Sequence, residues 1–405
     1  MLDDFGQRIR DIILSEMDLS RELSDEEICD LIGSVVSREA RDRPMTIKDR
    51  AELERTIFNS LRKLDVLQEL VDDRDVTEIM VNGPNDIFYE KAGRIQRFKG
   101  HFSSEEKLED VIQQIVGRHN RVVNQASPIV DTRLSDGSRV NIVLNPISIG
   151  GSAVSIRKFP EHPMSMERLV EIEALSPEVA RLLQILTQAK YNIFISGGTG
   201  SGKTTFLNAL SQYIPDDERI ITIEDSAELQ LLGAKNIVRL ETRNANTDGV
   251  TPITIRDLIR TALRMRPDRI IVGECRGAEA LDMLQAMNTG HDGSLSTGHA
   301  NSPHDIISRI ETMVLQGQDF PLNAIRQQIA SGIDIIVQLG RLRDKSRRVL
   351  EISEVDGFMD GEIVLHTLYR FEETAVLDSG RIQGFLKKVG TLCHTDKLMA
   401  AGLSV

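Results

Sequence analysis

The chain has 405 residues, more than one hydrophobic core usually supports, so we expect two or three domains. Its formal net charge of −13 argues against a nucleic-acid surface as the main function, because phosphate backbones are bound by basic faces. Its three cysteines form no C-x-x-C pair, which leaves no sequence signature for a structural zinc site or a disulfide framework.

The first segment, residues 1–70, is predicted to be a helical appendage. Charged residues alternate with apolar ones at helical spacing, as at Leu61, Leu64, Leu67 and Leu70. The charge run is most simply a solvated face, and no residue there suggests catalysis. The role of this segment is left open, with docking to a partner as the working hypothesis.

The next segment, residues 71–159, is predicted to be an α+β domain. From Val76 the pattern changes to short apolar runs joined by turns, which is typical of strands. A helix is expected from about Glu106, where apolar residues fall on one face. Asp136-Gly137 lies between two further apolar runs, and Asp-Gly in that setting is a strong β-hairpin signal.

Two further segments complete the chain. Residues 160–175 are predicted to form a linker, because Pro160 and Pro163 discourage a regular element. Residues 176–405 are predicted to form an α/β domain with a parallel sheet, since strand and helix patterns alternate up to about Val337. The rest of this domain is expected to add strands, hairpins and a short helical tail.

The most informative stretch joins an apolar strand, a glycine-rich turn and the start of a helix. It fits the P-loop pattern G-x-x-x-x-G-K-[ST], and the flanking strand and helix argue against a chance match. In a P-loop, backbone N–H groups surround phosphate oxygens; here Lys203 would reach the β- and γ-phosphates and the Thr204 hydroxyl would bind Mg²⁺. The predicted nucleotide-binding residues are Gly198, Thr199, Gly200, Ser201, Gly202, Lys203, Thr204 and Thr205.

Two later apolar strands end in carboxylates. Glu224, Asp225 and Glu228 end one strand, and Glu274 follows the next. Ligands of parallel sheets sit at the carboxyl ends of the strands, so these acids can polarise a water or hold Mg²⁺. The alternative is that they only cap turns. Glu274 would act as an atypical Walker B acid, because Gly273 occupies the position before it.

Two histidines and three arginines are further candidates. His291 and His299 lie in glycine-flanked loops and either contact phosphate or pack as ordinary residues; a metal site is disfavoured because no third ligand accompanies them. Arg133, Arg139 and Arg157 flank the hairpin of the α+β domain. They are either solvated or supply a guanidinium to the γ-phosphate from another domain or subunit.

In chain order these stretches resemble the Walker A, Asp box, Walker B and His box of the type II/type IV secretion ATPase superfamily. The residues that carry the resemblance are Gly197 to Thr205, Ile223 to Asp225 with Glu228, Val272 to Gly277, and Thr297 to Ala300. The Gly-Glu form of the Walker B motif is the usual form there, while the four-cysteine module of type II relatives is not matched. The chain looks closest to the CpaF-type ATPase of the tight-adherence (Flp) pilus, through its helical appendage, residues 154–159 and residues 264–268.

The resemblance implies an α/β architecture: a RecA-like P-loop NTPase domain preceded by a PAS-like α+β domain and a helical appendage. It implies a homohexamer that holds ATP and Mg²⁺ between the α+β and RecA-like domains. Glu228 would activate water, Glu274 and Thr204 would hold Mg²⁺, and both histidines would lie on the γ-phosphate side. The catalytic residues so implied are Lys203, Glu228, Glu274, Arg133, Arg139 and Arg157, and the phosphate-sensing residues are His291 and His299.

The implied function is a motor that hydrolyses ATP to assemble a tight-adherence pilus through an inner-membrane platform, with retraction left open. No run approaches eighteen apolar residues, so a partner is expected to supply any membrane span, with this chain cytoplasmic at the inner face of the cytoplasmic membrane. A close alternative is the ATPase of a type IV secretion system. Alternatives from other classes are a nucleic-acid translocase on a RecA-like core and a nucleotide-gated scaffold without hydrolysis.

Overall fold

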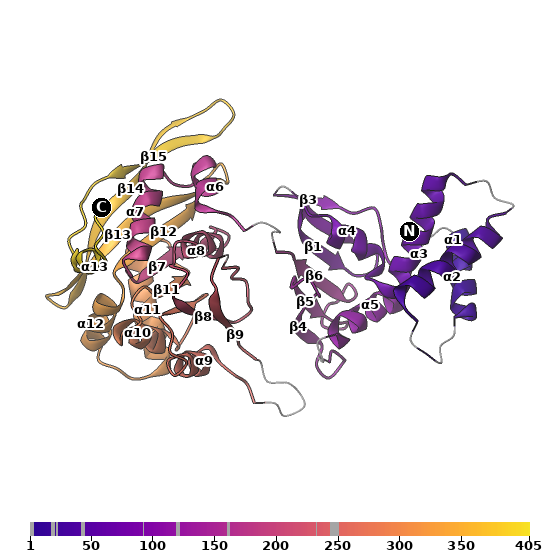
Figure 1. The fold of residues 1–405 in the computed structure, drawn as a ribbon, viewed down its shortest axis with the longest axis horizontal. Helices are drawn as coiled ribbons and strands as arrows, with labels where there is room; N and C mark the ends of the chain where they lie inside the picture. The colour runs from indigo at the N-terminus through magenta and orange to yellow at the C-terminus, as the bar shows by residue number, and fades with distance from the viewer. Residues whose placement is uncertain are drawn as a thin grey trace. The chain divides into compact units, whose positions relative to one another are not determined.

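The computed structural model describes residues 4–17, 21, 23–41, 45–91, 93–118, 122–159, 163–231, 233–243 and 251–405. The chain divides into two compact units, Met1–Glu161 and His162–Val405. Each unit has its own elements and its own cores, and the two are described separately below. Figure 1 shows the elements of both, from the N-terminus in indigo to the C-terminus in yellow.

The first unit begins with three helices, α1 (Asp4–Glu16), α2 (Asp25–Glu39) and α3 (Ile47–Arg62). α2 and α3 each start with a capping box, at Ser24 and Thr46, which satisfies backbone N–H groups of the first turn. The helices share a small apolar core of their own. It consists of Ile9, Ile13, Ile28, Ile32, Val35, Val36 and Ile57. The predicted helical appendage is confirmed.

The rest of this unit is an α+β domain whose antiparallel sheet has the strand order β3-β2-β1-β6-β5-β4. Its strands are β1 (Val76–Asn82), β2 (Ile87–Lys91), β3 (Arg94–Arg97), β4 (Ile129–Arg133), β5 (Arg139–Val143) and β6 (Ala153–Arg157). Its helices are η1 (Asp65–Leu67), α4 (Gln68–Asp72) and α5 (Glu105–Gly117). The apolar face of α5 packs into the core with side chains of the sheet. β4 and β5 form the hairpin that Asp136-Gly137 predicted.

Two predicted boundaries differ from the structure. Leu64, Leu67 and Leu70 belong to the core of the α+β domain, so the helical bundle ends before residue 70. The linker was predicted over residues 160–175. Its first three residues, 160–162, lie outside the described part of the chain. From Met166 onward, however, this stretch folds into α6 and enters a core of the second unit, because its apolar side chains outweigh the two prolines before it.

The second unit is built on a nine-stranded sheet with the order β15-β14-β13-β12-β7-β11-β10-β8-β9. The six strands from β12 to β9 in this order run parallel, and β13, β14 and β15 continue the sheet antiparallel. The strands are β7 (Ile193–Gly197), β8 (Arg219–Glu224), β9 (Asn236–Glu241), β10 (Arg269–Val272), β11 (Leu295–Gly298), β12 (Ile335–Arg341), β13 (Arg347–Met359), β14 (Glu362–Val376) and β15 (Ile382–Lys388). The predicted RecA-like α/β class is confirmed.

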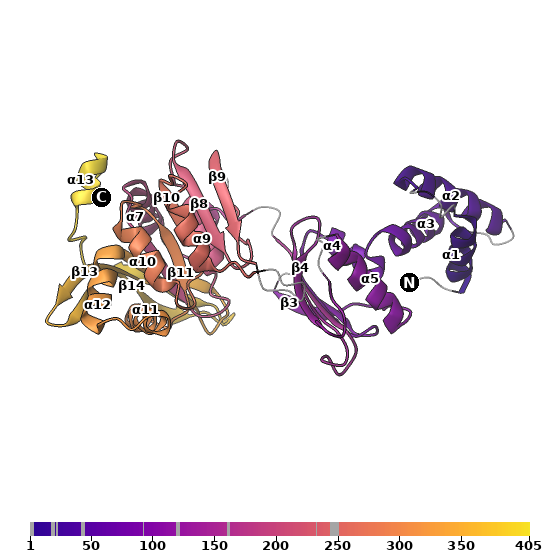
Figure 2. The same cartoon turned by 90° about the horizontal axis from the view of Figure 1, so that it is seen from below.

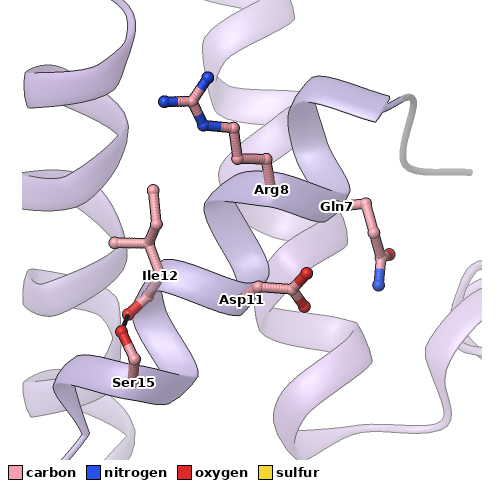
Figure 3. Close-up of a pocket in the computed structure, with 5 residues that line it drawn as sticks. All are labelled: Gln7, Arg8, Asp11, Ile12 and Ser15. Atoms are coloured by element: carbon pink, nitrogen blue, oxygen red, sulfur yellow. Dashed lines mark hydrogen bonds between the residues drawn. The ribbon is translucent and has the colours of Figure 1, made fainter.

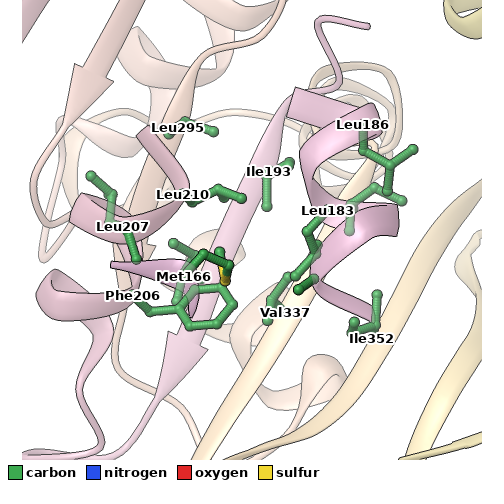
Figure 4. Close-up of a cluster of buried hydrophobic side chains, with 14 of the residues drawn as sticks. Met166, Leu183, Leu186, Ile193, Phe206, Leu207, Leu210, Leu295, Val337 and Ile352 are labelled. Carbon is green, nitrogen blue, oxygen red and sulfur yellow. The ribbon is translucent and has the colours of Figure 1, made fainter. Parts of the chain in front are cut away.

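Two apolar cores hold helices against this sheet, one on each face (Figures 1 and 2). β7 is buried throughout: Ile193 and Ile195 belong to one core and Phe194 to the other. Figure 4 shows the first core, where α7 and α8 pack on β7 and β12. The helices are α6 (Met166–Glu171), α7 (Pro177–Gln188), α8 (Lys203–Ser211), α9 (Ile255–Ala262), α10 (Ala280–Asn288), α11 (Pro303–Gly317), α12 (Leu322–Gly332) and α13 (Asp396–Ala401).

Candidate active site

The P-loop joins β7 to α8 in a backbone shape that requires glycine. Gly200 and Gly202 have φ of 71° and 95°, which side chains rarely tolerate. At Gly197, a Cβ would lie 2.5 Å from Ser201 Oγ and 2.7 Å from Leu339 O, so no side chain fits. The turn therefore leads directly into the first turn of α8, whose N–H groups have no partner within the helix and suit an anion.

Lys203 is folded back against the loop that carries it. Its Nζ donates to Gly197 O and Gly198 O, both at 3.0 Å, and lies 3.2 Å from His299 Nδ1. The side chain is 8% exposed, and this burial lowers its pKa. These partners are two carbonyls and a histidine ring, so the described contacts of this ammonium include no carboxylate.

His299 links the P-loop to the acid that follows β10. Its Nε2 lies 2.5 Å from Glu274 Oε1, while its Nδ1 faces the Lys203 ammonium. An ammonium has only donors, so Nδ1 must accept, and a neutral ring then carries its proton on Nε2, the nitrogen that faces Glu274. Burial lowers the pKa of His299, which favours this neutral form, although the Glu274 carboxylate acts in the opposite direction. The arrangement follows from the strand order, because β11 lies between β7 and β10.

Arg276 is a site residue to which the sequence pattern had given no role. It donates through Nη2 to Glu274 Oε2 at 2.5 Å, and its Nη1 lies 3.8 Å from Asp225 Oδ2. Its hydrogen bond to Glu274 raises the pKa of this guanidinium. Arg276 therefore bridges the acids after β8 and β10. Its position two residues after the Walker B glutamate was the only signal available in the sequence.

Glu224 shapes the loop that carries Glu228. Its side chain is buried, and Oε1 accepts the backbone N–H groups of Glu228 at 2.8 Å and Leu229 at 3.0 Å. A Cβ on Gly273 would lie 2.8 Å from Glu224 Cγ. Close packing against Glu224 thus explains why glycine, and not the usual aspartate, precedes Glu274.

Glu228 lies at the carboxyl edge of the sheet, on the loop after β8. This loop is tied to the P-loop helix, because the N–H of Gln230 donates to Asn208 Oδ1 on α8 at 3.0 Å. Glu228 itself is partly exposed. Its position allows contact with solvent near α8, and its predicted role in activating water stays a prediction.

His291 lies at the opposite edge of the sheet from the P-loop. It precedes β11, and β11 runs parallel to β7, so a whole strand of about 13 Å separates His291 from His299. The next residue, Asp292, pairs with Lys397, which also pairs with Asp334 just before β12. His291 Nδ1 lies 3.3 Å from Ala286 O. The prediction that His291 lies on the γ-phosphate side is therefore wrong for the site of its own subunit.

The three predicted arginines form a row across the sheet of the first unit. Arg133 pairs with Arg139, Arg139 with Arg157, and Arg157 with Glu78, each directly opposite on neighbouring strands. Directly opposed residues share a face, and like charges so placed repel. Arg157 Nε lies 4.0 Å from Glu78 Oε1. Their role at the P-loop of the second unit stays a prediction.

The first unit has a hollow on one face of α1 (Figure 3). Gln7, Arg8, Asp11, Ile12 and Ser15 line it. The Ser15 hydroxyl donates to Ile12 O at 2.7 Å within the same helix. This hollow is an exposed helix face without the convergent acid, base and glycine-rich turn of the P-loop, so the P-loop is the candidate active site.

Comparison with known proteins agrees with this geometry. The sequence profile of the family described as "Type II/IV secretion system protein" matches residues 60–383. The chain belongs to this family. It is an ATP hydrolase of the secretion and pilus type, and nucleotide binding follows from that membership. The CpaF subtype is a finer distinction that the profile does not make.

Relatives of the family cover most of the chain. The conjugal transfer protein TrbB of Rhizobium radiobacter is 31% identical over 332 residues, covering 81% of this chain and 98% of the relative. The type IV secretion system protein PtlH of Bordetella pertussis is 33% identical over 320 residues, covering 73% and 94%. The crystal structure of the pilus retraction motor PilT with bound ADP has a TM-score of 0.55 at 22% identity, covering 82% and 84%. That last likeness concerns the fold.

Proposed function

We propose that this chain is the motor subunit of a homohexamer that hydrolyses ATP, with Mg²⁺, to assemble a tight-adherence pilus through an inner-membrane platform. The observation that carries the catalytic part is the series Lys203, His299 and Glu274, which joins the ends of three adjacent strands. The ammonium of Lys203 holds two carbonyl oxygens that the oxygens of a triphosphate can replace. The pilus part rests on the resemblance of the sequence to CpaF-type ATPases.

The chemistry assigned to the residues follows from their contacts. Lys203 exchanges the two P-loop carbonyls for β- and γ-phosphate oxygens when ATP binds. Glu228 orients and activates the attacking water, on the loop that Glu224 holds in place. His299 contacts both Lys203 and Glu274. Loss of the γ-phosphate therefore changes the contacts of His299 and, through them, those of β11, the strand that ends just before it.

The donor set fits a magnesium ion that is shared with the nucleotide. No group of three or more His, Cys, Asp or Glu residues within the described ranges could hold a metal alone. Mg²⁺ in such sites usually keeps several waters and takes one or two protein ligands besides the phosphates. Thr204, in the first turn of α8, and Glu274, after β10, supply those two oxygens. Bound there, the ion would neutralise charge that develops on the phosphates.

Neighbouring subunits are proposed to complete the site. The row of Arg133, Arg139 and Arg157 concentrates positive charge on one face of the α+β sheet, which suits a γ-phosphate. The described part of the chain contains no helix that is both long and apolar enough to cross a membrane. We therefore assign the membrane span to platform proteins and place the motor in the cytoplasm beneath them.

Two variants test the catalytic assignment. Lys203→Ala should abolish turnover, and Glu228→Gln should leave ATP bound but hardly cleaved, with phosphate release and nucleotide retention measured on the assembled protein. Glu109→Gln, at an exposed glutamate of α5, is the matched control and should hydrolyse ATP normally. A Glu228→Gln protein that cleaved ATP at the wild-type rate would remove Glu228 from its role.

A second candidate is the ATPase of a type IV secretion or conjugation system. The similarity to PtlH and TrbB favours it. Both candidates share the chemistry and differ in cargo, so deletion of the gene separates them: loss of surface filaments supports the pilus motor, and loss of DNA or protein transfer supports the alternative. ATPase activity that rises on adding DNA would instead support a nucleic-acid translocase, and a ring that binds ATP without phosphate release would support a scaffold.

A further inference from the structure

Gln338 is a polar side chain inside an otherwise apolar stretch of β12. Its neighbours Ile336, Val337 and Leu339 are all buried, and Gln338 itself is 3% exposed. Burying an amide costs free energy unless hydrogen bonds inside the protein replace those to water. The partners of this amide therefore indicate what the glutamine does there.

The amide nitrogen of Gln338 bonds to carbonyls beside both loops of the candidate active site. Its Nε2 donates at 3.2 Å to Ala300 O, the carbonyl of the residue that follows His299. It also donates at 3.2 Å to Leu339 O. That second carbonyl lies against the P-loop, because a Cβ on Gly197 would come within 2.7 Å of it. One amide group thus ties the loop of His299 to the strand on which the P-loop rests.

The strand register brings Gln338 to this place. It lies directly opposite Ser196 of β7, and Ser196 lies directly opposite Gly298 of β11. Directly opposed residues of neighbouring strands share one face of the sheet, so these residues form a row across β12, β7 and β11. The row ends at the residue before His299. A long side chain on β12 can therefore reach past Ser196 to the loop that follows β11.

Two polar atoms of this row are left without a hydrogen bond. Ser196 Oγ and Gln338 Oε1 are buried, and neither has a partner among the described residues. An apolar side chain of similar size in place of Gln338 would leave no such acceptor unpaired, so stability alone does not account for a glutamine. What only the amide supplies is the N–H group that holds Ala300 O.

We propose that Gln338 is a positioning residue of the ATPase, which acts by holding the backbone of His299 through the carbonyl of Ala300. In that position the ring of His299 lies 3.2 Å from Lys203 Nζ and 2.5 Å from Glu274 Oε1. Both contacts are at hydrogen-bond distance, so a small shift of the loop breaks them. This assignment rests on the proposed function of His299 in ATP hydrolysis and adds to it the residue that orients the ring.

The test measures where His299 lies and how fast ATP is cleaved. Gln338→Met keeps the length of the side chain but removes its N–H donors. In the full chain without nucleotide, diethyl pyrocarbonate should label His299 severalfold faster than in the wild type, as read by peptide mass spectrometry, because the ring leaves its two partners. His291, at the opposite edge of the sheet, should keep its rate and serves as the internal control. With ATP and Mg²⁺, kcat should fall on the order of ten- to a hundredfold while KM stays near its wild-type value, since a misplaced group costs rate.

Further variants separate positioning from a purely structural role. If Gln338 acts through His299, adding Gln338→Met to His299→Gln should lower kcat little further. Gln338→Asn keeps an amide in the core but is one methylene too short to hold Ala300, so it should behave like Gln338→Met and replaces that variant should methionine prevent folding. Gln383→Met, at an exposed glutamine of β15, is the matched control and should equal the wild type in every measurement.

The proposal is overturned by an unchanged labelling rate of His299 in the folded variants of Gln338, by equal rises at His299 and His291, or by a change confined to KM. Losses of kcat that simply add in the double variant also overturn it. The labelling needs no ATP hydrolysis. A wild type that neither binds nor cleaves ATP would refute the proposed function, while the labelling of His299 would still decide whether Gln338 positions it.

Discussion

In the nine-stranded sheet, charged side chains have different partners at the two ends of the strands, which are called its amino-terminal edge and its carboxyl-terminal edge. At the amino-terminal edge, Arg269 is fully buried, and its guanidinium donates to Glu218 and to the carbonyls of Thr187 and Gly293. Each of its nitrogens thus has a protein acceptor. The guanidinium of Arg269 therefore connects β10 with the end of α7 and with the loops before β8 and β11. None of its nitrogens is left to bind a ligand.

At the carboxyl-terminal edge, the partners are ones that a ligand can replace. Lys203 rests on two loop carbonyls and a neutral histidine, and Ser201 Oγ has no acceptor within the described residues. Buried polar groups that are weakly or incompletely satisfied cost stability, and proteins retain them mainly where function needs them. The contrast between the edges therefore separates charges that hold the fold from charges that serve the substrate.

The largest effect is expected at the carboxyl-terminal edge. Lys203→Ala should lower the rate of phosphate release by a factor on the order of 10² to 10³ or more, because the developing charge on the phosphates loses its ammonium. Thermal unfolding should hardly change, since the ammonium is already poorly solvated and bonds only replaceable partners. A large drop in Tm would show that Lys203 also holds the fold, and the comparison of the two edges would fail.

The amino-terminal edge should respond in the opposite way. Arg269→Met should lower the free energy of unfolding by about 3–5 kcal/mol, because Glu218 is left as a buried charge with only the more distant ammonium of Lys190, at 3.6 Å. ATP hydrolysis by the molecules that remain folded should be unchanged. Urea unfolding and phosphate release measure the two quantities. Changing Glu218→Leu in addition should restore part of the stability, whereas Arg341→Met, at an exposed arginine, should be neutral.

A smaller effect is expected at Glu224, whose side chain shapes the loop that carries Glu228. Glu224→Gln keeps the shape of the side chain but removes the charge that accepts the N–H groups of Glu228 and Leu229. Charge-assisted hydrogen bonds are about twice as strong as neutral ones, so the loop should loosen and kcat should fall by roughly tenfold. The KM for ATP should stay near its wild-type value. A change confined to KM would mean that Glu224 acts on binding instead.

The smallest effect concerns a buried tyrosine. Tyr191 donates to His394 O at 2.6 Å, and burial raises the pKa of its hydroxyl to about 12. The unfolded chain therefore loses this proton near pH 10 while the folded chain keeps it, so stability falls as the pH rises from about 10 to 12. Tyr191→Phe should cost about 1 kcal/mol at pH 7 and make unfolding less sensitive to that alkaline range. Denaturation at pH 7 and at pH 11 checks both statements, and an unchanged alkaline slope would contradict the second.

Local chemistry made much of the fold and the site predictable from the sequence. The P-loop depends on glycines at fixed spacing, and the alternation of apolar runs with helical patterns is enough to indicate a parallel sheet. The carboxylates after β8 and β10 were recognisable because each ends an apolar strand, and those strands are indeed neighbours.

The contacts between distant segments were not predictable in the same way. Lys203 meets His299 only because β11 lies between β7 and β10, and chain order alone does not reveal that placement. His291 shared the glycine-rich surroundings of His299, yet one short strand puts them at opposite edges of the sheet. The bond from Arg276 to Glu274 and the close packing of Gly273 on Glu224 likewise depend on tertiary structure.

The position of β11 has a consequence for the folding of the chain. Lys203 and His299 are 96 residues apart in the chain, so their contact forms only when β11 pairs with β7. A nascent or half-folded chain can present the glycine-rich turn, but it lacks the histidine and the acid beside it. We therefore expect the chain to hydrolyse ATP only after β11 has paired.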